Sequence, residues 1–171
     1  MNLSLPKNKA LLPAVLAVLL LWSGYCLWLW QPERQVALHQ RHLLDAIERR
    51  QWNALRDFLA DDFEDAQGHD KVWVLKESRE MLRHFHIFLT IEDRDTTHLL
   101  PERTDGSGPV VAKVHSLLRI DGRGSALVDE IKRRVNATDE PFEFHWRKSG
   151  WKPWEWQLVY VTHPLLGQAY P

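Results

Sequence analysis

Residues 142–162 read FEFHWRKSGWKPWEWQLVYVT, and this stretch decides the fold. Aromatic residues alternate with polar ones from Phe142 to Arg147, which is the period of a strand with one buried face. Ser149-Gly150 predicts a turn, and Trp154 to Thr162 predicts a second strand that closes the sheet. In that second strand we expect three residues to share one face, namely Trp156, Leu158 and Tyr160.

Further strands are predicted before this pair. Ile87 to Leu100 is rich in Thr, Ile and Leu, and Pro109 to Asp121 alternates apolar and polar side chains. Residues 101–109 predict a loop and Gly122-Arg123-Gly124 predicts a turn, after which Ser125 to Ala137 predicts another strand. The second half of the chain is therefore predicted to form a meander of four or five strands.

Three helices are predicted before this meander. Apolar residues recur at helical spacing from Glu33 to Arg50 and again from Trp52 to Leu59. A third helix is predicted over about Lys71 to His84. Because helices come first and strands follow, we predict an α+β fold in which three helices pack on one face of an antiparallel sheet of four to six strands.

The N-terminal segment has a different character. Residues 10–30 read ALLPAVLAVLLLWSGYCLWLW, and no charged residue falls between Lys9 and Glu33. A helix needs about 20 apolar residues to cross a bilayer, and Trp28 and Trp30 are typical of its boundary. The exit of the segment contains no pair of small residues, which argues against a cleaved signal peptide. We therefore expect a transmembrane helix at 10–30 that contacts the lipid bilayer.

This segment divides the chain into four parts. A short tail (1–9) precedes the span (10–30), an α+β domain follows at 33–163, and a C-terminal tail occupies 164–171. The positive charges that flank the span nearly balance, and long domains translocate largely regardless of charge. We favour a single-pass protein of the inner membrane with a periplasmic domain, on the assumption that the source is bacterial.

Composition excludes several classes of function. The 171-residue chain has a net charge of −1 and a pI near 6.8, so it lacks the basic footprint of a nucleic-acid-binding protein. Its one cysteine, Cys26, lies in the apolar segment. The domain therefore has no cysteine for a disulfide, a cysteine-ligated zinc site or a thiol nucleophile.

Two local motifs resemble the nuclear transport factor 2-like superfamily. Trp52-Asn53-Ala54-Leu55 followed by residues 59–63 resembles the family's short helix that ends in an acidic-aromatic corner, and residues 142–147 and 154–158 resemble its final hairpin. The resemblance covers about Glu33 to His163 and implies a cone of helices against a curved sheet, with a pocket between them. It also implies a range of activities, since the superfamily includes ketosteroid isomerases, polyketide cyclases, dehydratases and non-catalytic binding or scaffold proteins.

Titratable residues offer only weak candidates for chemistry. The acidic run from Asp61 to Asp65 could hold paired carboxylates with split pKa values, but charge runs usually face water. His39 and His42 are spaced to share a metal ion on a helix, although no third ligand stands at a recognised spacing. His115 and His145 are expected to face outward from their strands. We predict no catalytic residue, no metal site and no cofactor.

The tryptophans near the C-terminus are the more unusual feature. Aromatic side chains can line a ligand pocket, form a partner surface, or fill the core of a small domain. Trp151 and Trp154 flank the turn and are the two that a core explains least. The candidate residues for binding a partner protein or a small apolar ligand are Trp146, Trp151, Trp154, Trp156 and Tyr160.

Three functions are consistent with these patterns. The first is a membrane-anchored, non-catalytic domain that binds a partner protein or a small apolar ligand. The second is an assembly scaffold that resembles the single-span periplasmic components of type IV secretion. Such a scaffold could form a homo-oligomer. The third is an enzyme of the isomerase or cyclase kind, which needs a carboxylate or histidine that points into the cone.

Overall fold

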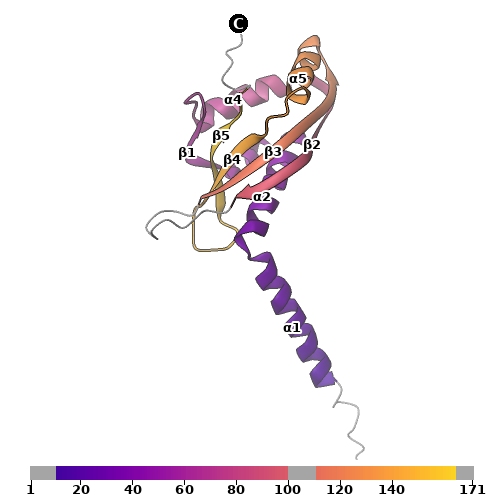
Figure 1. Cartoon of the computed structure of the whole chain (residues 1–171), viewed down its shortest axis with the longest axis vertical. Coiled ribbons are helices and arrows are strands. Elements are labelled where there is room, and N and C mark those ends of the chain that lie inside the picture. Colours follow the sequence, from indigo (N-terminus) through magenta and orange to yellow (C-terminus); the bar gives the residue numbers. More distant parts are fainter. Residues whose placement is uncertain (1–10, 100–110, 165–171) are drawn as a thin grey trace, which may run out of the picture.

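The computed structural model describes residues 11–99 and 111–164 (Figure 1). The predicted tail at 1–9, the predicted loop at 101–109 and the C-terminal tail after Pro164 lie outside the described residues. The described elements are, in chain order, α1 (Leu11–Leu29), α2 (Pro32–Glu48), α3 (Trp52–Phe58), β1 (Leu59–Asp65), α4 (Lys71–Leu82), β2 (Phe85–Leu99), β3 (Val111–Gly124), α5 (Ala126–Asn136), β4 (Phe142–Lys148) and β5 (Trp156–Thr162).

The α+β class and the three helices before the strands are confirmed as α2, α3 and α4. Pro32 lies in the first turn of α2, where a backbone N–H has no intrahelical partner. The missing N–H of proline therefore costs little at this position. Asp70 caps the N-terminus of α4, and its side chain accepts a hydrogen bond of 2.8 Å from the backbone N–H of Trp73. Helix boundaries thus follow local signals in the sequence.

Residues 125–137 were predicted to form a strand, and this prediction is wrong, because they form helix α5. The apolar residues of this segment are spaced by three and four, and Val128 and Ile131 face inward while Val135 packs beside them. On the opposite face, Glu130 forms ion pairs with Arg133 and Arg134, and these pairs stabilise the helix. The helical period was therefore present in the sequence.

The sheet has the strand order β1-β5-β4-β3-β2 and is mixed, not antiparallel as predicted. Strand β1 pairs in parallel with β5, whereas the other neighbours are antiparallel. The acidic run was not predicted to be a strand, but it lies in β1, an edge strand that buries Leu59, Ala60 and Phe63. It lies beside the last strand of the chain in the sheet.

The turn predicted at residues 122–124 is instead the end of β3, where Gly124 pairs with Phe85. A Cβ atom on Gly124 would lie 1.8 Å from the carbonyl oxygen of His84. Glycine is required here because two backbone segments meet with no room for a side chain.

The core lies between the sheet and helices α2 and α3. It includes Val36 and Leu43 from α2, Val114 from β3, and Trp146 and Leu158 from β4 and β5. A second apolar cluster joins α5 to the end of α4 and the start of β2, and consists of Leu82, Phe85, Val128 and Ile131. The helices therefore cover the inner face of the sheet.

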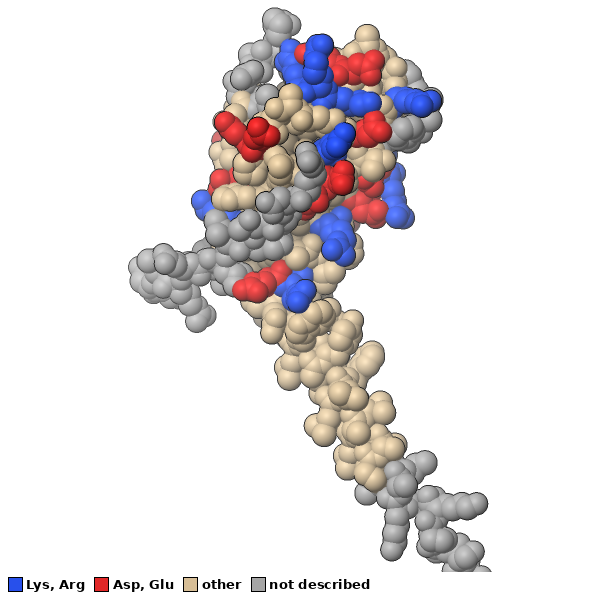
Figure 2. Space-filling model, turned by 45° about the vertical axis from the view of Figure 1, so that its right-hand side comes forward, with Lys and Arg blue, Asp and Glu red and all other residues tan. Residues whose placement is uncertain are grey.

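Helix α1 projects away from this domain (Figure 1). Figure 2 shows no Lys, Arg, Asp or Glu along its described length, and Leu20 and Leu21 are 73% and 75% exposed. Among the described residues no single helix is both long and apolar enough to cross a membrane, whereas Pro13–Leu29 and Pro32–Glu48 satisfy those criteria as a pair bent by 69°. The transmembrane helix at 10–30 remains a prediction.

Candidate functional site

The five aromatic residues named from the sequence do not come together in one site. Trp146 and Trp156 lie in the core, at 0% and 4% exposure. Trp151 and Trp154 are exposed in the turn between β4 and β5. Tyr160 lies on the outer face of the sheet. The set is therefore divided among three environments.

Tyr160 was expected to share a face with Trp156 and Leu158, and this expectation is wrong. Leu158 pairs with Trp146, but Tyr160 pairs with His145. An advance of two residues along β5 therefore corresponds to an advance of one residue along β4. Such a bulge turns the following residues to the opposite face. The ring of Tyr160 consequently lies 5.0 Å from the ring of His145, between centroids, on the face away from the helices.

The interior of the cone is occupied by a hydrogen-bonded tryptophan. The indole Nε1 of Trp146 donates a hydrogen bond of 2.9 Å to Oε1 of Gln40, and Nε2 of Gln40 lies 3.5 Å from the hydroxyl of Ser116. Gln40 and Ser116 are both buried. Polar atoms deep in the cone thus bind one another.

His39 packs against the same tryptophan. Its ring lies edge-on to Trp146 and Phe58, with centroids 5.8 Å and 6.1 Å away. Burial lowers the pKa of His39 and outweighs hydrogen bonds from the ring to the backbone of Gln35 and Trp154. Within the described part of the chain, no group of three or more His, Cys, Asp or Glu side chains is arranged to hold a metal ion.

The outer face of the sheet carries a polar cluster centred on Glu143. Its carboxylate contacts Nε2 of His145, Nζ of Lys113 at 3.2 Å and Nε2 of His115 at 3.3 Å. We call the following residues the outer-face cluster: Lys113, His115, Glu143, His145 and Tyr160. The hydrogen bond from His145, followed by that from Lys113, lowers the pKa of Glu143 to about 2 against the opposing effect of burial.

A second ion pair extends this polar face toward β1. The guanidinium of Arg147 donates two hydrogen bonds to Asp62, of 2.8 Å and 2.6 Å, and its hydrogen bonds lower the pKa of that carboxyl. Elsewhere in the acidic run, Asp61 pairs with Lys71 at 3.0 Å, and Asp65 accepts hydrogen bonds from His69. The carboxylates of the run therefore bind different partners and do not form an acid–base pair.

No family model matches the chain, and no curated protein matches it. Its structure is similar to that of an NTF2-like protein of unknown function from Pseudomonas putida KT2440, with a TM-score of 0.52 and 14% identity over 75% of this chain and 82% of that one. The fold is NTF2-like. The resemblance inferred from the sequence is thereby confirmed at the level of the fold.

Two further solved structures are similar to this NTF2-like chain. One is a protein of unknown function with a cystatin-like fold from Nostoc punctiforme PCC 73102, with 12% identity over 77% of this chain and 92% of that one and a TM-score of 0.49. The other is ActVI-ORFA from Streptomyces coelicolor, with 13% identity over 76% and 92% and a TM-score of 0.48.

The NTF2-like domain is joined to α1 by specific contacts. The side-chain amide of Gln35 donates a hydrogen bond of 2.7 Å to the carbonyl oxygen of Leu29, the last residue of α1. The guanidinium carbon of Arg34 lies 4.2 Å from the ring centroid of Trp28. We call these contacts the α1–α2 joint. They connect the end of α1 to the first turn of α2.

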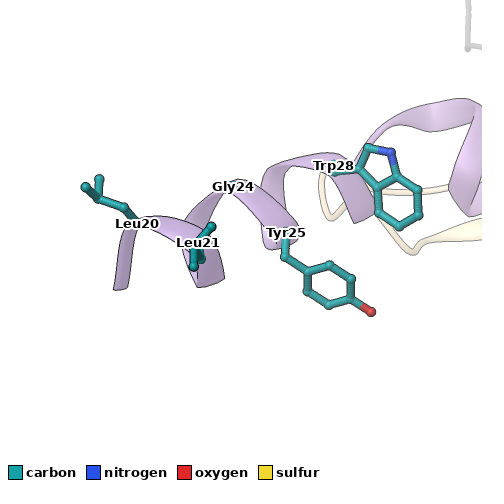
Figure 3. A pocket seen from close by; sticks show the side chains of 5 residues that line it. All are labelled: Leu20, Leu21, Gly24, Tyr25 and Trp28. Atoms are coloured by element: carbon teal, nitrogen blue, oxygen red, sulfur yellow. The ribbon is translucent and has the colours of Figure 1, made fainter. Parts of the chain in front are cut away.

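The flank of α1 below this joint is hollowed and apolar. Figure 3 shows the residues that line the hollow, which has a volume of about 620 Å³. They are Leu20, Leu21, Gly24, Tyr25 and Trp28. The hollow is open along the helix, so it is a surface feature of α1 and not an enclosed chamber of the NTF2-like domain.

Sequence reasoning missed the outer-face cluster as a unit. His115 and His145 were expected to face outward, and both do. The missing information was the strand register, which places His115 opposite Glu143 and Lys113 opposite His145. Alternation alone indicates a face, whereas register decides which residues of two strands are neighbours.

Proposed function

We propose that this protein is a membrane-tethered, non-catalytic NTF2-like domain that binds a partner protein through the outer face of its sheet. The observation that carries the proposal is the contrast between the two faces of β4. On the inner face Trp146 is packed and hydrogen-bonded to Gln40. On the outer face Glu143 gathers two imidazoles and an ammonium group within reach of solvent.

The packed interior favours a protein partner over a small apolar ligand. A ligand site, or the active site of an isomerase or cyclase, needs an enclosed cavity with a few convergent polar groups. In this chain Trp146, Gln40 and Ser116 occupy that position and bind one another. A ligand bound at this position would have to displace the wholly buried indole of Trp146.

The outer-face cluster has the chemistry of a recognition surface. Glu143 is held ionised, His115 and His145 present ring nitrogens, and Tyr160 presents an aromatic ring with a hydroxyl group. Tyrosine and arginine are enriched in the energetic centres of protein interfaces. Because the charged groups are already in position, a partner would bind them without ordering long side chains first.

Helix α1 supports the tether. Its apolar side chains are exposed from Val15 to Leu27, and water-exposed apolar surface of this extent marks a binding surface or a membrane contact. Burial in hydrocarbon would remove that surface from water at about 25 cal/mol per Å². With the tail on the cytoplasmic side, the domain would stand on the periplasmic face of an inner membrane.

Site-specific photocrosslinking tests the binding surface. A photoreactive phenylalanine analogue replaces Tyr160 in the full chain, and the control places it at Val72, which is 73% exposed on α4. We expect a discrete adduct from position 160 that is absent from position 72 and that weakens when Glu143→Gln is added. An adduct between two copies of the chain would favour the assembly scaffold, and equal labelling from both positions would contradict the proposal.

Vesicle flotation tests the tether separately. The full chain should float with liposomes and resist extraction by carbonate. A Leu20→Arg/Leu21→Arg variant should lose both properties, because two charges near the middle of a span are costly in the bilayer. Flotation of the variant equal to that of the natural chain would contradict a tether through α1.

A further inference from the structure

We infer that Trp151 and Trp154, in the turn between β4 and β5, lie in the lipid headgroup layer of the membrane that α1 enters. The domain would then contact the bilayer at two places, through α1 and through this turn. The inference rests on the proposed tether and adds to it a second membrane contact, which the tether alone does not require.

The first observation is the exposure of these two indoles. Trp151 is 83% exposed and Trp154 is 52% exposed, whereas Trp146 and Trp156 on the adjoining strands are buried. One short segment therefore sends two tryptophans into the core and two into solvent. An exposed indole gains most at a bilayer boundary, where its ring contacts apolar chains and its N–H stays hydrated.

The second observation is that the turn is held by hydrogen bonds between its own residues. Ser149 N–H donates to the carbonyl oxygen of Glu155 at 2.9 Å, and Glu155 N–H donates to that of Lys152 at 3.2 Å. The Glu155 carboxylate accepts a hydrogen bond from the backbone of Lys152 at 3.1 Å and pairs with its ammonium at 3.3 Å. The indole of Trp156 is fixed to the carbonyl oxygen of Pro153 at 2.9 Å. The backbone that presents the two exposed indoles is thus already ordered.

The third observation is the position of the turn. It lies at the end of the domain from which α1 departs (Figure 1). A hydrogen bond between the His39 ring and the backbone of Trp154 joins it to the N-terminal half of α2. The same end carries Trp28 and Trp30, the tryptophans at the predicted exit of the span. Two separate segments therefore present exposed indoles at one end of the domain.

The lipid headgroup layer is the occupant that fits these facts. The turn lies at the end of the domain from which α1 and its flanking tryptophans depart, so both would meet the same boundary. Lys148 and Lys152 accompany the indoles, and the ammonium of Lys152 lies 5.9 Å from the ring of Trp151. Cations beside a membrane surface are attracted to lipid phosphates.

Depth-dependent quenching tests this contact in the full chain. Cys26, the single cysteine, is changed to Ser, and a fluorophore is attached at Ser149→Cys beside the turn. The control carries it at Asp139→Cys, an exposed position just before β4 and therefore at the other end of that strand. Both proteins are reconstituted in vesicles of phosphatidylcholine and phosphatidylglycerol that contain lipids spin-labelled in the headgroup.

We expect quenching at position 149 to exceed that at position 139 by roughly twofold or more, since only the first site would lie at the interface. Adding Trp151→Ser and Trp154→Ser should reduce the quenching at 149 to the control value. Equal quenching at both positions in a chain that floats with vesicles would overturn this inference and leave the tether intact. A chain that does not float would overturn both. Unchanged thermal unfolding of the double variant would confirm that its effect is not loss of the fold.

Discussion

The indole Nε1 of Trp146 donates its hydrogen bond to a side chain 106 residues earlier in the chain, Oε1 of Gln40, at 2.9 Å. Both residues are buried, so this bond links β4 to α2 across the middle of the cone. It explains how a bulky polar aromatic residue is accommodated in the interior of a small domain: its one donor has a dedicated acceptor.

Gln40→Leu should therefore destabilise the domain. The substitution leaves a buried indole N–H without its acceptor, and the free energy of unfolding should fall by about 1–3 kcal/mol. Denaturant unfolding of the full chain in detergent measures the change. His42→Leu, at an exposed position on the same helix, should change the free energy by less than about 0.5 kcal/mol. Equal effects of the two substitutions would refute the role of the bond.

Glu143→Gln should show a pH-dependent loss of stability. The folded-state pKa of Glu143 is lowered from 4.5 to about 2, so ionised Glu143 stabilises the native state above the unfolded-state value. That contribution is lost as the pH falls from about 4.5 to about 2. The difference in free energy of unfolding between natural and variant chains should be largest near neutral pH and disappear toward pH 2, as measured by urea unfolding at several pH values. Glu64→Gln, at an exposed position on β1, is the control, and a Glu143 effect that is constant with pH would contradict this explanation.

Two glycine substitutions should differ in cost. An alanine Cβ at Gly124 would meet backbone, 1.8 Å from the His84 carbonyl oxygen, whereas at Gly150 it would meet the end of the Glu155 side chain. Gly124→Ala should therefore reduce the free energy of unfolding by about 1–3 kcal/mol because the β3 end must move. Gly150→Ala should cost less, since the Glu155 side chain can rotate away. Thermal unfolding of both variants gives the order, and the reverse order would be inconsistent with this geometry.

Much of the fold could be predicted from the sequence, because three helices and most strands have clear periodicity. The errors had specific physical causes. Helix α5 follows a turn signal within a run of strands, which favoured a strand there, although Val128, Ile131 and Val135 recur at the helical spacing of three and four. The sequence alternation of β5 does not reveal the bulge that turns Tyr160 outward. The edge strand β1 is hard to predict because it is rich in carboxylates, which pair with residues outside the strand such as Lys71 and Arg147.

The candidate sites were harder to predict than the elements. The sequence correctly marked Trp151 and Trp154 as the tryptophans that a core explains least. It could not show that their turn lies at the end of the domain from which α1 departs, because that placement depends on the tertiary fold. The outer-face cluster likewise depends on pairing between β3 and β4. Local patterns indicated which residues were unusual, and the topology decided which of them became neighbours.

Gln35→Leu should loosen the α1–α2 joint without unfolding the domain. The substitution removes the donor to the Leu29 carbonyl oxygen and places an apolar side chain of similar size at a buried position. Spin labels at Cys26 and at Asp139→Cys should give a narrow distance distribution in the natural chain and a broader one in the variant. Gln31→Leu, an exposed position in the same joint, should leave the width unchanged. Equal widths for Gln35→Leu and the natural chain would mean that the hydrogen bond does not hold the joint.

The joint also has a consequence for how a partner could be found. A domain on a flexible linker explores a large volume, and its effective concentration at any one point falls with linker length. Here the domain is joined to α1 by the bond between Gln35 and Leu29 and by the contact of Arg34 with Trp28. We expect these contacts to restrict the orientation of the domain relative to α1. If α1 spans a bilayer, as we propose, the outer face of the sheet would stay at a nearly constant distance from that bilayer. The domain would then select partners by the distance of their binding surface from the membrane as well as by the chemistry of that surface.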